Sequence, residues 1–259
     1  MIDASLRRRV QAGETTLGCF LNLGSPMAAE LCGHAGYDWL IVDLEHGATT
    51  EATLLAMLHA VAATPAEAVV RVEEATRLRI GRALDFGARA LMVPRIDTVE
   101  QVERAASYVR YQPAGARGVA LPTRGAGYGT LGHAGVATAH DDICLFVQIE
   151  SGAALEAAPE IAAVEGVDVL FIGPADLSHA LGTPGDITSA AYREAVSFVG
   201  AAAASAGKAA GVLLWSLEEL PMYIEAGYRA FALGSDGGFV AAAARGLVAD
   251  FRGRLAQAG

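Results

Sequence analysis

Eight short apolar segments recur along the chain, and amphipathic segments separate them. The apolar segments are residues 17–23, 39–43, 68–72, 89–94, 143–150, 167–173, 209–214 and 228–234. Their apolar residues are mostly continuous rather than alternating, which is typical of strands buried on both faces of a parallel sheet. The amphipathic segments include residues 28–36, 50–63, 76–86, 99–110, 191–206 and 217–226. This strand–helix alternation predicts a parallel sheet with crossover helices.

Glycines close several of the amphipathic segments, shortly before the next apolar segment begins. Gly36, Gly87, Gly166 and Gly227 stand at these positions. Glycine tolerates the left-handed conformation that ends a helix, so these are typical helix-to-strand loops. Eight strand–helix repeats within 259 residues predict an α/β fold, a single (β/α)8 TIM barrel domain over residues 1–259. An open doubly wound sheet is the alternative arrangement of the same repeats.

The composition argues against several classes of function. Hydrophobic residues make up 53% of the chain and charged residues 19%, which is typical of a globular protein. A formal net charge of −10 argues against nucleic-acid binding, because phosphate binding needs clustered lysines and arginines. No apolar run reaches the roughly 18 residues of a membrane span, so we expect no membrane partner.

The N-terminus and the cysteines bear on the location of the protein. The first ten residues contain no apolar core of a signal peptide. Cys19, Cys32 and Cys144 are odd in number and far apart, so we expect neither a disulfide framework nor a cysteine metal site. A reducing, cytoplasmic location is therefore expected.

Polar residues stand where the predicted strands end. In a TIM barrel the catalytic groups lie at the C-terminal ends of the strands. The residues at or near these ends are Asp43, Glu45, His46, Arg71, Arg95, Gln148, Glu150, Asp176, Ser235 and Asp236. Because they come from several strands, we expect them to converge on one mouth and to form a site.

Two carboxylates are the strongest candidates for holding a metal. Glu150 and Asp176 each follow an apolar strand, and they are one strand–helix unit apart. Two carboxylates with water and substrate oxygens suit octahedral Mg²⁺, Mn²⁺ or Co²⁺. The structural alternatives are an N-cap for Asp176 and a first-turn carboxylate for Glu150. Spacing alone does not decide between these interpretations.

The segment Gly173-Pro174-Ala175-Asp176 ends one strand and opens a helix. The backbone N–H groups of Ala175 and Asp176 would point at an anion, whereas Pro174 has no N–H group. A substrate carboxylate would bind there beside the metal. A rigid Gly-Pro turn without ligand is the alternative.

One histidine and three charged residues are candidates for acid–base and electrostatic roles. His46 lies three residues after Asp43, and a nearby carboxylate raises the basicity of a histidine. Arg71 lies at an apolar strand end, where a guanidinium must pair with a carboxylate or face the charge of a ligand. Asp85 ends a helix, where a carboxylate opposes the helix dipole and therefore needs a partner. A structural salt bridge between Asp85 and an arginine is the alternative.

The chain contains a single lysine, Lys208, and its position bears on the mechanisms that are open to a site at the mouth. A Schiff base between a lysine and a ketone is the metal-free way to stabilise a carbanion. Lys208 precedes its strand, which places it at the N-terminal face of the barrel, away from the catalytic face. We therefore expect no Schiff-base lysine, and we expect no nucleotide cofactor.

Several ordered motifs resemble one known family. They are LIVDLEHG (40–47), VVRV (69–72), ALDFGARALMVP (83–94), RYQPAGARGV (110–119), FVQIES (146–151), VEGVDVLFIGPADL (164–177) and GSD (234–236). Together they resemble the HpcH/HpaI aldolase family, the class II pyruvate aldolases. The likeness runs from about residue 17 to residue 250.

The resemblance implies a barrel of the phosphoenolpyruvate/pyruvate type and a metal-dependent carbon–carbon lyase. The family cleaves 4-hydroxy-2-oxo acids, reversibly, to pyruvate or a close relative such as hydroxypyruvate and an aldehyde; its members include 4-hydroxy-2-oxoheptanedioate and 2-keto-3-deoxy sugar acid aldolases. A divalent cation, Mg²⁺, Mn²⁺ or Co²⁺, binds the 2-oxo acid. The resemblance also implies a homo-oligomer, a trimer or a hexamer, whose subunits exchange a C-terminal helix.

By the same resemblance, matching positions receive roles in binding. Glu150 and Asp176 would be the metal ligands, and Gln148 and the Ala175 backbone would contact the substrate, within the segment that begins at Gly173 and Pro174. Such a metal acts as a Lewis acid at the ketone, which is the electron sink that aldol cleavage needs.

The resemblance gives roles in catalysis to four more residues. His46 would be the base, oriented by Asp43, and Asp85, often from a neighbouring subunit, would raise its basicity. Arg71 would stabilise the developing enolate, as a cation does where negative charge forms.

Two features depart from the family pattern, and two other functions are alternatives. Arg95 stands where a neutral residue is expected, so it would bind an anionic or hydroxylated substrate or pair with Glu150 or Asp236. Residues 111–141 are rich in glycine and alanine and form either a functional loop or a decorated connection. A CoA-thioester lyase of the citrate lyase β or malyl-CoA lyase type shares the barrel but needs a basic patch for coenzyme A. An inactive barrel that acts as a scaffold is the third hypothesis.

Overall fold

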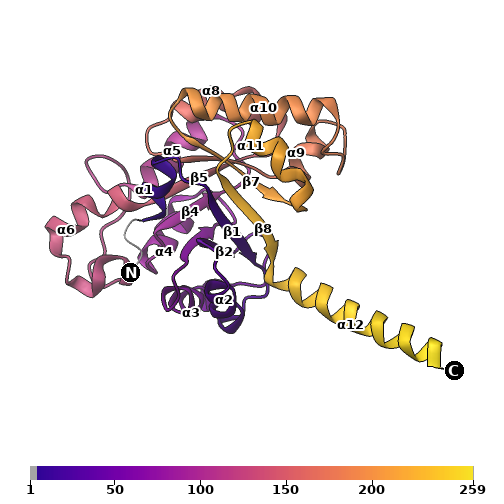
Figure 1. Cartoon of the computed structure of the whole chain (residues 1–259). Helices are drawn as coiled ribbons and strands as arrows, with labels where there is room; N and C mark the ends of the chain where they lie inside the picture. Colours follow the sequence, from indigo (N-terminus) through magenta and orange to yellow (C-terminus); the bar gives the residue numbers. More distant parts are fainter. Residues whose placement is uncertain (1–4, 259) are drawn as a thin grey trace.

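Eight parallel strands close into a barrel in the computed structural model, which describes residues 5–258 (Figure 1). Each strand pairs with its neighbour in sequence, and β8 pairs with β1 to close the sheet. The strands are β1 (Thr16–Leu21), β2 (Trp39–Asp43), β3 (Glu67–Arg71), β4 (Ala90–Val93), β5 (Cys144–Ile149), β6 (Val169–Ile172), β7 (Ala209–Leu214) and β8 (Ala230–Ser235). The predicted TIM barrel is confirmed, and the open sheet is excluded because β1 and β8 are hydrogen-bonded to each other.

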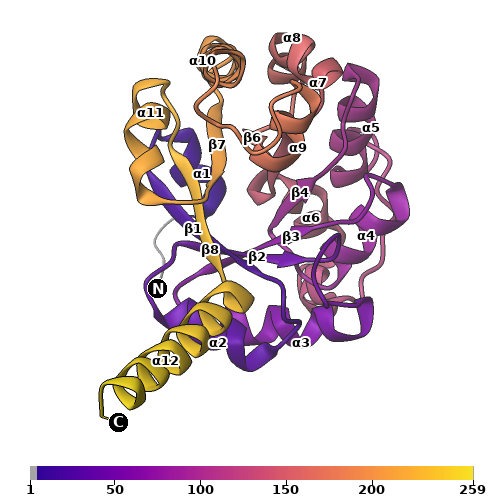
Figure 2. The ribbon, with the colours of Figure 1, turned by 90° about the vertical axis from the view of Figure 1, so that its right-hand side faces the viewer.

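Helices follow the strands and surround the barrel (Figure 2). The α-helices are α1 (Leu6–Gln11), α2 (Pro26–His34), α3 (Glu51–Ala62), α4 (Arg77–Asp85), α5 (Val99–Val109), α6 (Gly132–Thr138), α7 (Gly152–Glu156), α8 (Ala158–Ala163), α9 (Pro174–Ala180), α10 (Ala190–Ser205), α11 (Leu220–Glu225) and α12 (Asp236–Ala258). The 3-10 helices are η1 (Arg124–Gly129), η2 (Ala139–Asp142) and η3 (Leu217–Glu219).

The helices agree with the sequence patterns to within about two residues, with one exception. The predicted helix over residues 217–226 is divided into η3 and α11. Pro221 lies in the first turn of α11, and a proline there lacks the N–H group that would continue a preceding helix. The amphipathic pattern therefore missed this break.

The barrel interior is filled by its own side chains and closed at the bottom by α1. Trp39, Phe146 and Phe171 form an aromatic cluster with ring centroids 5.5–6.4 Å apart. Leu6 and Val10 of α1 are buried against this interior cluster. A second, larger apolar cluster lies between the barrel and the surrounding helices. The chemistry is therefore restricted to the open end of the barrel.

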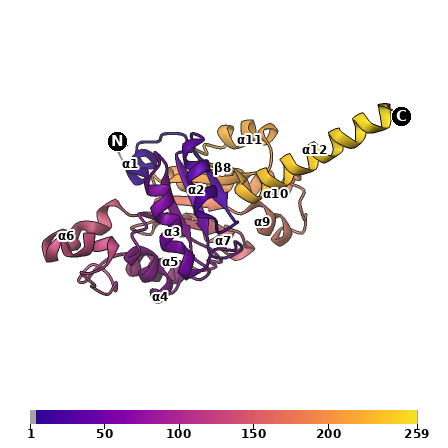
Figure 3. The ribbon, with the colours of Figure 1, turned by 90° about the horizontal axis from the view of Figure 1, so that it is seen from below.

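The helix α12 does not fold back onto the barrel. It leaves the end of β8 and extends away from the other elements, on the opposite side from α6 (Figures 1 and 3). Its residues Val240, Leu247, Phe251 and Leu255 are between 62% and 73% exposed. Among residues 5–258 there is no helix that is both long enough and apolar enough to cross a membrane.

Residues 111–141 connect α5 to β5 at the N-terminal face of the barrel. Arg117 forms an ion pair with Asp85 at the end of α4, and Arg124 Nη1 donates a hydrogen bond of 3.2 Å to the Phe86 carbonyl. Arg7 of α1 hydrogen-bonds to the Asp141 carbonyl. These contacts place the segment away from the mouth of its own barrel, which favours the expected alternative of an extended connection over a loop that acts at that mouth.

We predict that the packed interior tolerates no additional side chain at Gly18. A Cβ atom at Gly18 in β1 would lie 2.3 Å from Cε3 of Trp39. Gly18→Ala should therefore lower the free energy of unfolding by about 1–3 kcal/mol, measured by urea denaturation. In Gly81→Ala, the control, the added Cβ meets no atom within 4 Å, and this helical change should raise stability by up to about 1 kcal/mol. Equal stability of Gly18→Ala and the wild type would contradict the packing.

Candidate active site

A buried ion pair between two neighbouring strand ends forms the centre of the mouth. Arg71 ends β3 and Asp43 ends β2, and the two residues are in register. Arg71 Nε and Nη2 donate hydrogen bonds of 2.8 and 2.7 Å to the two oxygens of Asp43, and Nη1 lies 3.1 Å from Oε2 of Glu45. Arg71 is 8% exposed and Asp43 is fully buried. The predicted requirement that Arg71 be paired is therefore met by both carboxylates.

The pairing keeps the arginine charged despite its burial. Burial acts to lower the pKa of Arg71, but the hydrogen bonds and charge of Asp43, together with the charges of Glu45 and Glu150, outweigh it and raise that pKa. Three of its five N–H groups are engaged by Asp43 and Glu45, so two remain for a ligand. Arg71 is thus a fixed cation that lines the cavity of the barrel.

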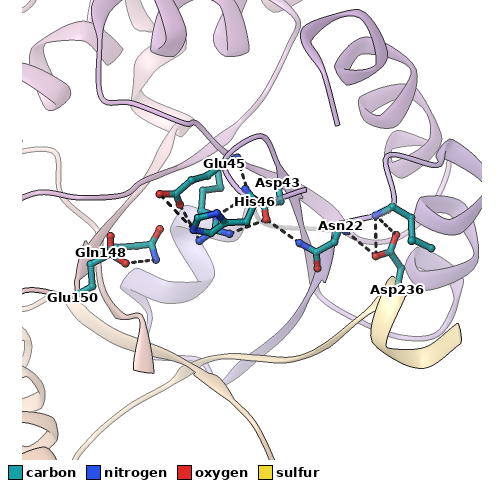
Figure 4. Close-up of polar contacts among 9 residues, drawn as sticks. Asn22, Asp43, Glu45, His46, Gln148, Glu150 and Asp236 are labelled. Carbon is teal, nitrogen blue, oxygen red and sulfur yellow. Dashed lines mark hydrogen bonds and ion pairs between the residues drawn. The ribbon is translucent and has the colours of Figure 1, made fainter. Parts of the chain in front are cut away.

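Asn22 and Asp236 extend this network around the mouth (Figure 4). The side-chain amide of Asn22 donates a hydrogen bond of 2.9 Å to Asp43, and its backbone N–H donates one of 2.7 Å to Asp236. Asp236 is 3% exposed and also begins α12. The chain of contacts therefore joins the ends of β2 and β3 to those of β1 and β8.

His46 lies at the mouth with an exposed imidazole. Its side chain is 67% exposed, and its Nε2 lies 3.8 Å from Oε1 of Glu45. Oδ1 of Asp43 accepts hydrogen bonds from the backbone N–H groups of Glu45 and His46, at 3.0 and 3.3 Å. Asp43 thus holds the backbone of the loop that carries His46, whereas we expected it to orient the ring itself.

Glu150 lies opposite, on the loop after β5, and is surrounded by polar groups. Its Oε1 accepts a hydrogen bond of 2.7 Å from the backbone N–H of Arg95, and its Oε2 accepts one of 3.1 Å from Gln148. Burial raises the pKa of Glu150, and the nearby carboxylates of Glu45 and Asp176 raise it further. The side-chain oxygen of Gln148 is buried without a hydrogen-bond partner among the described residues. A carboxylate that forms no ion pair with a described residue therefore lies next to a side chain with an unsatisfied acceptor.

Asp176 lies in the first turn of α9, and Gly173 is the N-cap of that helix. The N-cap interpretation of Asp176 is therefore wrong, and its carboxylate lines the cavity. A Cβ atom at Gly173 would lie 2.8 Å from Oε2 of Glu150, so the absence of a side chain lets the two loops approach. Pro174 and Ala175 line the same cavity.

The cavity at the mouth has a volume of about 610 Å³ and two unlike walls. One wall carries the polar groups, including Asn22, His46, Arg71, Gln148 and Asp176. The other wall is apolar and comes from the ends of β7 and β8 and the start of α12; it includes Leu213, Leu214, Trp215, Leu233 and Phe239. The cavity therefore suits a small ligand that has a charged end.

Asp85 is the one predicted catalytic residue that the chain does not bring to this mouth. It ends α4, which runs back to the N-terminal face, and its Oδ1 lies 3.3 Å from Nη2 of the buried Arg117. The salt bridge that the sequence offered as an alternative is thus present. Within one chain Asp85 belongs to the anchoring of residues 111–141.

The sequence analysis placed Glu45 and Asp236 at the mouth without giving them a role, and it missed Asn22. Glu45 joins Arg71 to His46, and Asn22 and Asp236 join at the far side of Asp43. Glu45 and Asp236 follow strand ends, and this position was a usable signal. Asn22 carried a weaker sequence signal, because a single polar residue in an apolar segment does not indicate its partner.

Comparisons with known proteins show which family and which fold the chain resembles. A family model described as HpcH/HpaI aldolase/citrate lyase matches residues 16–243. The hydroxypyruvate/pyruvate aldolase of Paraburkholderia phytofirmans is 41% identical over 89% of this chain and 91% of its own. The 2-keto-3-deoxy-L-rhamnonate aldolase of Klebsiella pneumoniae is 40% identical over 82% of this chain and 80% of its own. The crystal structure of an HpcH/HpaI aldolase/citrate lyase family protein from Burkholderia cenocepacia superposes with a TM-score of 0.90, at 38% identity, over 95% of this chain and 98% of that one.

We predict that the buried ion pair is costly to break. Asp43→Asn removes the charge that faces Arg71 in a buried position, so it should lower the free energy of unfolding by about 3 kcal/mol. Arg82→Gln is the control, since Arg82 and Glu51 form an ion pair whose side chains are 47% and 39% exposed, and its cost should stay below about 1 kcal/mol. Urea denaturation measures both. Equal costs for the two variants would show that Asp43 and Arg71 do not depend on each other.

Proposed function

We propose that this chain is a divalent-metal-dependent aldolase, because it belongs to the HpcH/HpaI aldolase/citrate lyase family and is a carbon–carbon lyase of the aldolase type. It would cleave a 4-hydroxy-2-oxo acid, reversibly, to pyruvate or hydroxypyruvate and an aldehyde. The observation that carries the proposal is a pair of carboxylates at the mouth that form no ion pair with a described residue. Asp176 lines the cavity together with the buried cation Arg71, and Glu150 lies beside Gly173 of the same lining.

The residues at the mouth fit a divalent cation. Glu150 and Asp176 leave negative charge that no ion pair neutralises among the described residues, and the Gln148 oxygen adjoins them without a partner. Within residues 5–258 there is no cluster of three or more His, Cys, Asp or Glu that would enclose an ion. Two carboxylates with water and substrate oxygens are the set that Mg²⁺ or Mn²⁺ prefers over a cage of protein ligands.

The cation, when bound, supplies a Lewis acid at the ketone of the substrate. The substrate carboxylate would lie at the start of α9, near the backbone of Gly173, Pro174 and Ala175. Gln148 would contact the 2-oxo acid from the polar wall. These groups would fix the 2-oxo acid end of the substrate at the mouth.

The cleavage itself needs a base and a fixed positive charge. His46 would take the proton of the 4-hydroxyl group; the C3–C4 bond then breaks, the aldehyde leaves, and the electron pair passes into an enolate. Arg71 has two N–H groups available and is held by Asp43 and Glu45, so it would stabilise the enolate oxygen without rearranging. Protonation of the enolate carbon completes the reaction.

A Schiff-base route finds no residue at the mouth. Lys208 directly precedes β7, so it lies at the end of the barrel opposite the cavity, and its backbone N–H donates to the Ala203 carbonyl. It is the only lysine of the chain. The position of Lys208 therefore supports the metal-dependent chemistry.

We also propose that the enzyme is a homo-oligomer, a trimer or a hexamer, that exchanges α12. Val240, Leu247, Phe251 and Leu255 lie on one face of this helix, here called the α12 stripe, and all are exposed. A second copy of the chain is the occupant that a self-complementary exchange requires. An assembly would also cover the exposed His46 and allow Asp85 of the partner subunit to reach a mouth. The three cysteines are free and buried, which supports a cytoplasmic location.

We predict that metal binding and activity are lost together. Glu150→Gln keeps the size and the hydrogen-bond acceptor but removes the charge, so Mn²⁺ affinity should fall by about 100-fold or more. Mn²⁺ binding is measured by electron paramagnetic resonance, and aldol formation from pyruvate or hydroxypyruvate is measured with a panel of aldehydes. Lys208→Ala is the control and should keep both properties. Aldol product after complete removal of metal with EDTA would overturn the proposed mechanism.

We predict that charge on the α12 stripe dissociates the assembly. Phe251→Glu places a carboxylate in the apolar contact and should reduce the molar mass measured by light scattering. Ala249→Glu adds the same group to the opposite face of the helix and should leave the molar mass unchanged. If the wild type is already a monomer, or if both variants behave alike, the exchange does not occur.

A further inference from the structure

A second cavity lies at the catalytic face, beside Glu150 and separate from the cavity of the mouth. It has a volume of about 450 Å³. The loop between β3 and α4 forms one side of it, the loop between β4 and α5 forms another, and α5 forms the third. Neither the proposed metal site nor the base uses this space.

The lining of the second cavity is rich in arginine. Arg77, Arg95 and Arg104 come from three different elements, and none of them forms an ion pair with a described residue. Glu73 also lines the cavity; its Oε1 lies 3.0 Å from Nε of Arg79, which pairs with Glu51 as well, and its Oε2 is buried without a hydrogen-bond partner among the described residues. The exposed Glu74 is the remaining carboxylate of the lining. In a chain of net charge −10, such a surplus of guanidinium groups at one place favours an anionic ligand.

One face of α5 supplies further donors. Gln101, Arg104 and Tyr108 are three and four residues apart, so they lie on the same side of the helix, and all three line the cavity. The side-chain oxygen of Gln101 accepts the backbone N–H groups of Asp97 and Thr98, at 2.7 and 3.0 Å. Its amide NH₂ group is therefore available to a ligand.

Arg95 connects this cavity to the proposed metal ligand. Its backbone N–H donates to Glu150 at 2.7 Å, and its φ angle is +53°, a left-handed conformation that is uncommon for a residue other than glycine. Ser151, next to Glu150, donates a hydrogen bond of 2.6 Å to Asp97 on the same loop as Arg95. The second cavity is thus held in a fixed position next to Glu150.

We propose that the second cavity is the subsite for the end of the aldehyde remote from its carbonyl group, and that it selects aldehydes that end in a carboxylate or a phosphate. The inference rests on the proposed aldolase function. A ligand anchored near Glu150 and Asp176 would extend past Arg95, and its anionic end would meet the guanidinium groups of Arg95, Arg104 and Arg77. Arg95 therefore has a positive role in specificity, and it forms no ion pair with Glu150 or Asp236.

Two matched pairs of aldehydes test the selectivity with the full-length, Mn²⁺-loaded enzyme and pyruvate. D-glyceraldehyde 3-phosphate is compared with D-glyceraldehyde, and succinic semialdehyde is compared with butanal. In at least one pair, the charged aldehyde should have a kcat/KM about tenfold or more above that of its neutral partner. The pair that shows this preference distinguishes a phosphate from a carboxylate ligand.

Substitution of Arg104 shows whether the second cavity is responsible. Arg104→Gln should reduce the charged-to-neutral ratio of kcat/KM by about tenfold. Arg193→Gln is the matched control, since Arg193 is exposed on α10, far along the chain from the cavity, and should leave the ratio unchanged. An unchanged ratio in Arg104→Gln and Arg77→Gln, or no preference in either pair of aldehydes, would overturn the proposal.

A binding measurement separates this inference from the proposed function. Isothermal titration calorimetry with inorganic phosphate is done on the metal-free wild type and on Arg104→Gln. Phosphate binding that Arg104→Gln removes would support the anion subsite, even if no aldehyde gave product and the aldolase function failed. Turnover of neutral aldehydes, without any charge preference and without phosphate binding, would overturn the subsite and leave the aldolase function in place.

Discussion

The buried pair of Arg71 and Asp43 is the interaction on which the mouth of the barrel depends. A guanidinium at an apolar strand end is stable only because a carboxylate in register on the neighbouring strand accepts two hydrogen bonds from it. The same carboxylate holds the backbone of the loop that carries His46 and receives the amide of Asn22. One side chain, that of Asp43, therefore positions both Arg71 and the loop that carries His46.

In the other part of the mouth, the charged groups lack ion-pair partners among the described residues. Glu150 and Asp176 form no ion pair with a described residue, the oxygen of Gln148 has no hydrogen-bond partner, and burial together with carboxylate neighbours raises the pKa of Glu150. A group of this kind has its charge completed by a ligand, which is how perturbed carboxylates indicate a site. In the proposed mechanism, Arg71 would stabilise the enolate, and the carboxylates of Glu150 and Asp176 would hold the cation.

The single chain leaves two features without an intramolecular purpose. The α12 stripe exposes large apolar side chains along a helix that extends from the barrel, and His46 lies open to solvent. Asp85 lies at the far face, bonded to Arg117. The exchange of α12 between copies that we propose would cover both features, and it would supply a route by which Asp85 meets a neighbouring mouth.

The sequence by itself determined the barrel, because eight apolar segments with helices between them have few other ways to be buried. It also determined which residues reach the mouth, since Glu150, Asp176, His46 and Arg71 were predicted to lie at the C-terminal ends of strands. It did not indicate the ion-pair partners of these residues, because the pairing of Arg71 with Asp43 and Glu45 depends on the register of the strands. The backbone contact from Arg95 to Glu150, and the grouping of Arg95 with arginines from α4 and α5, were decided by tertiary structure alone. Distances between loops follow from how the closed sheet positions its strands, and no local pattern of residues encodes them.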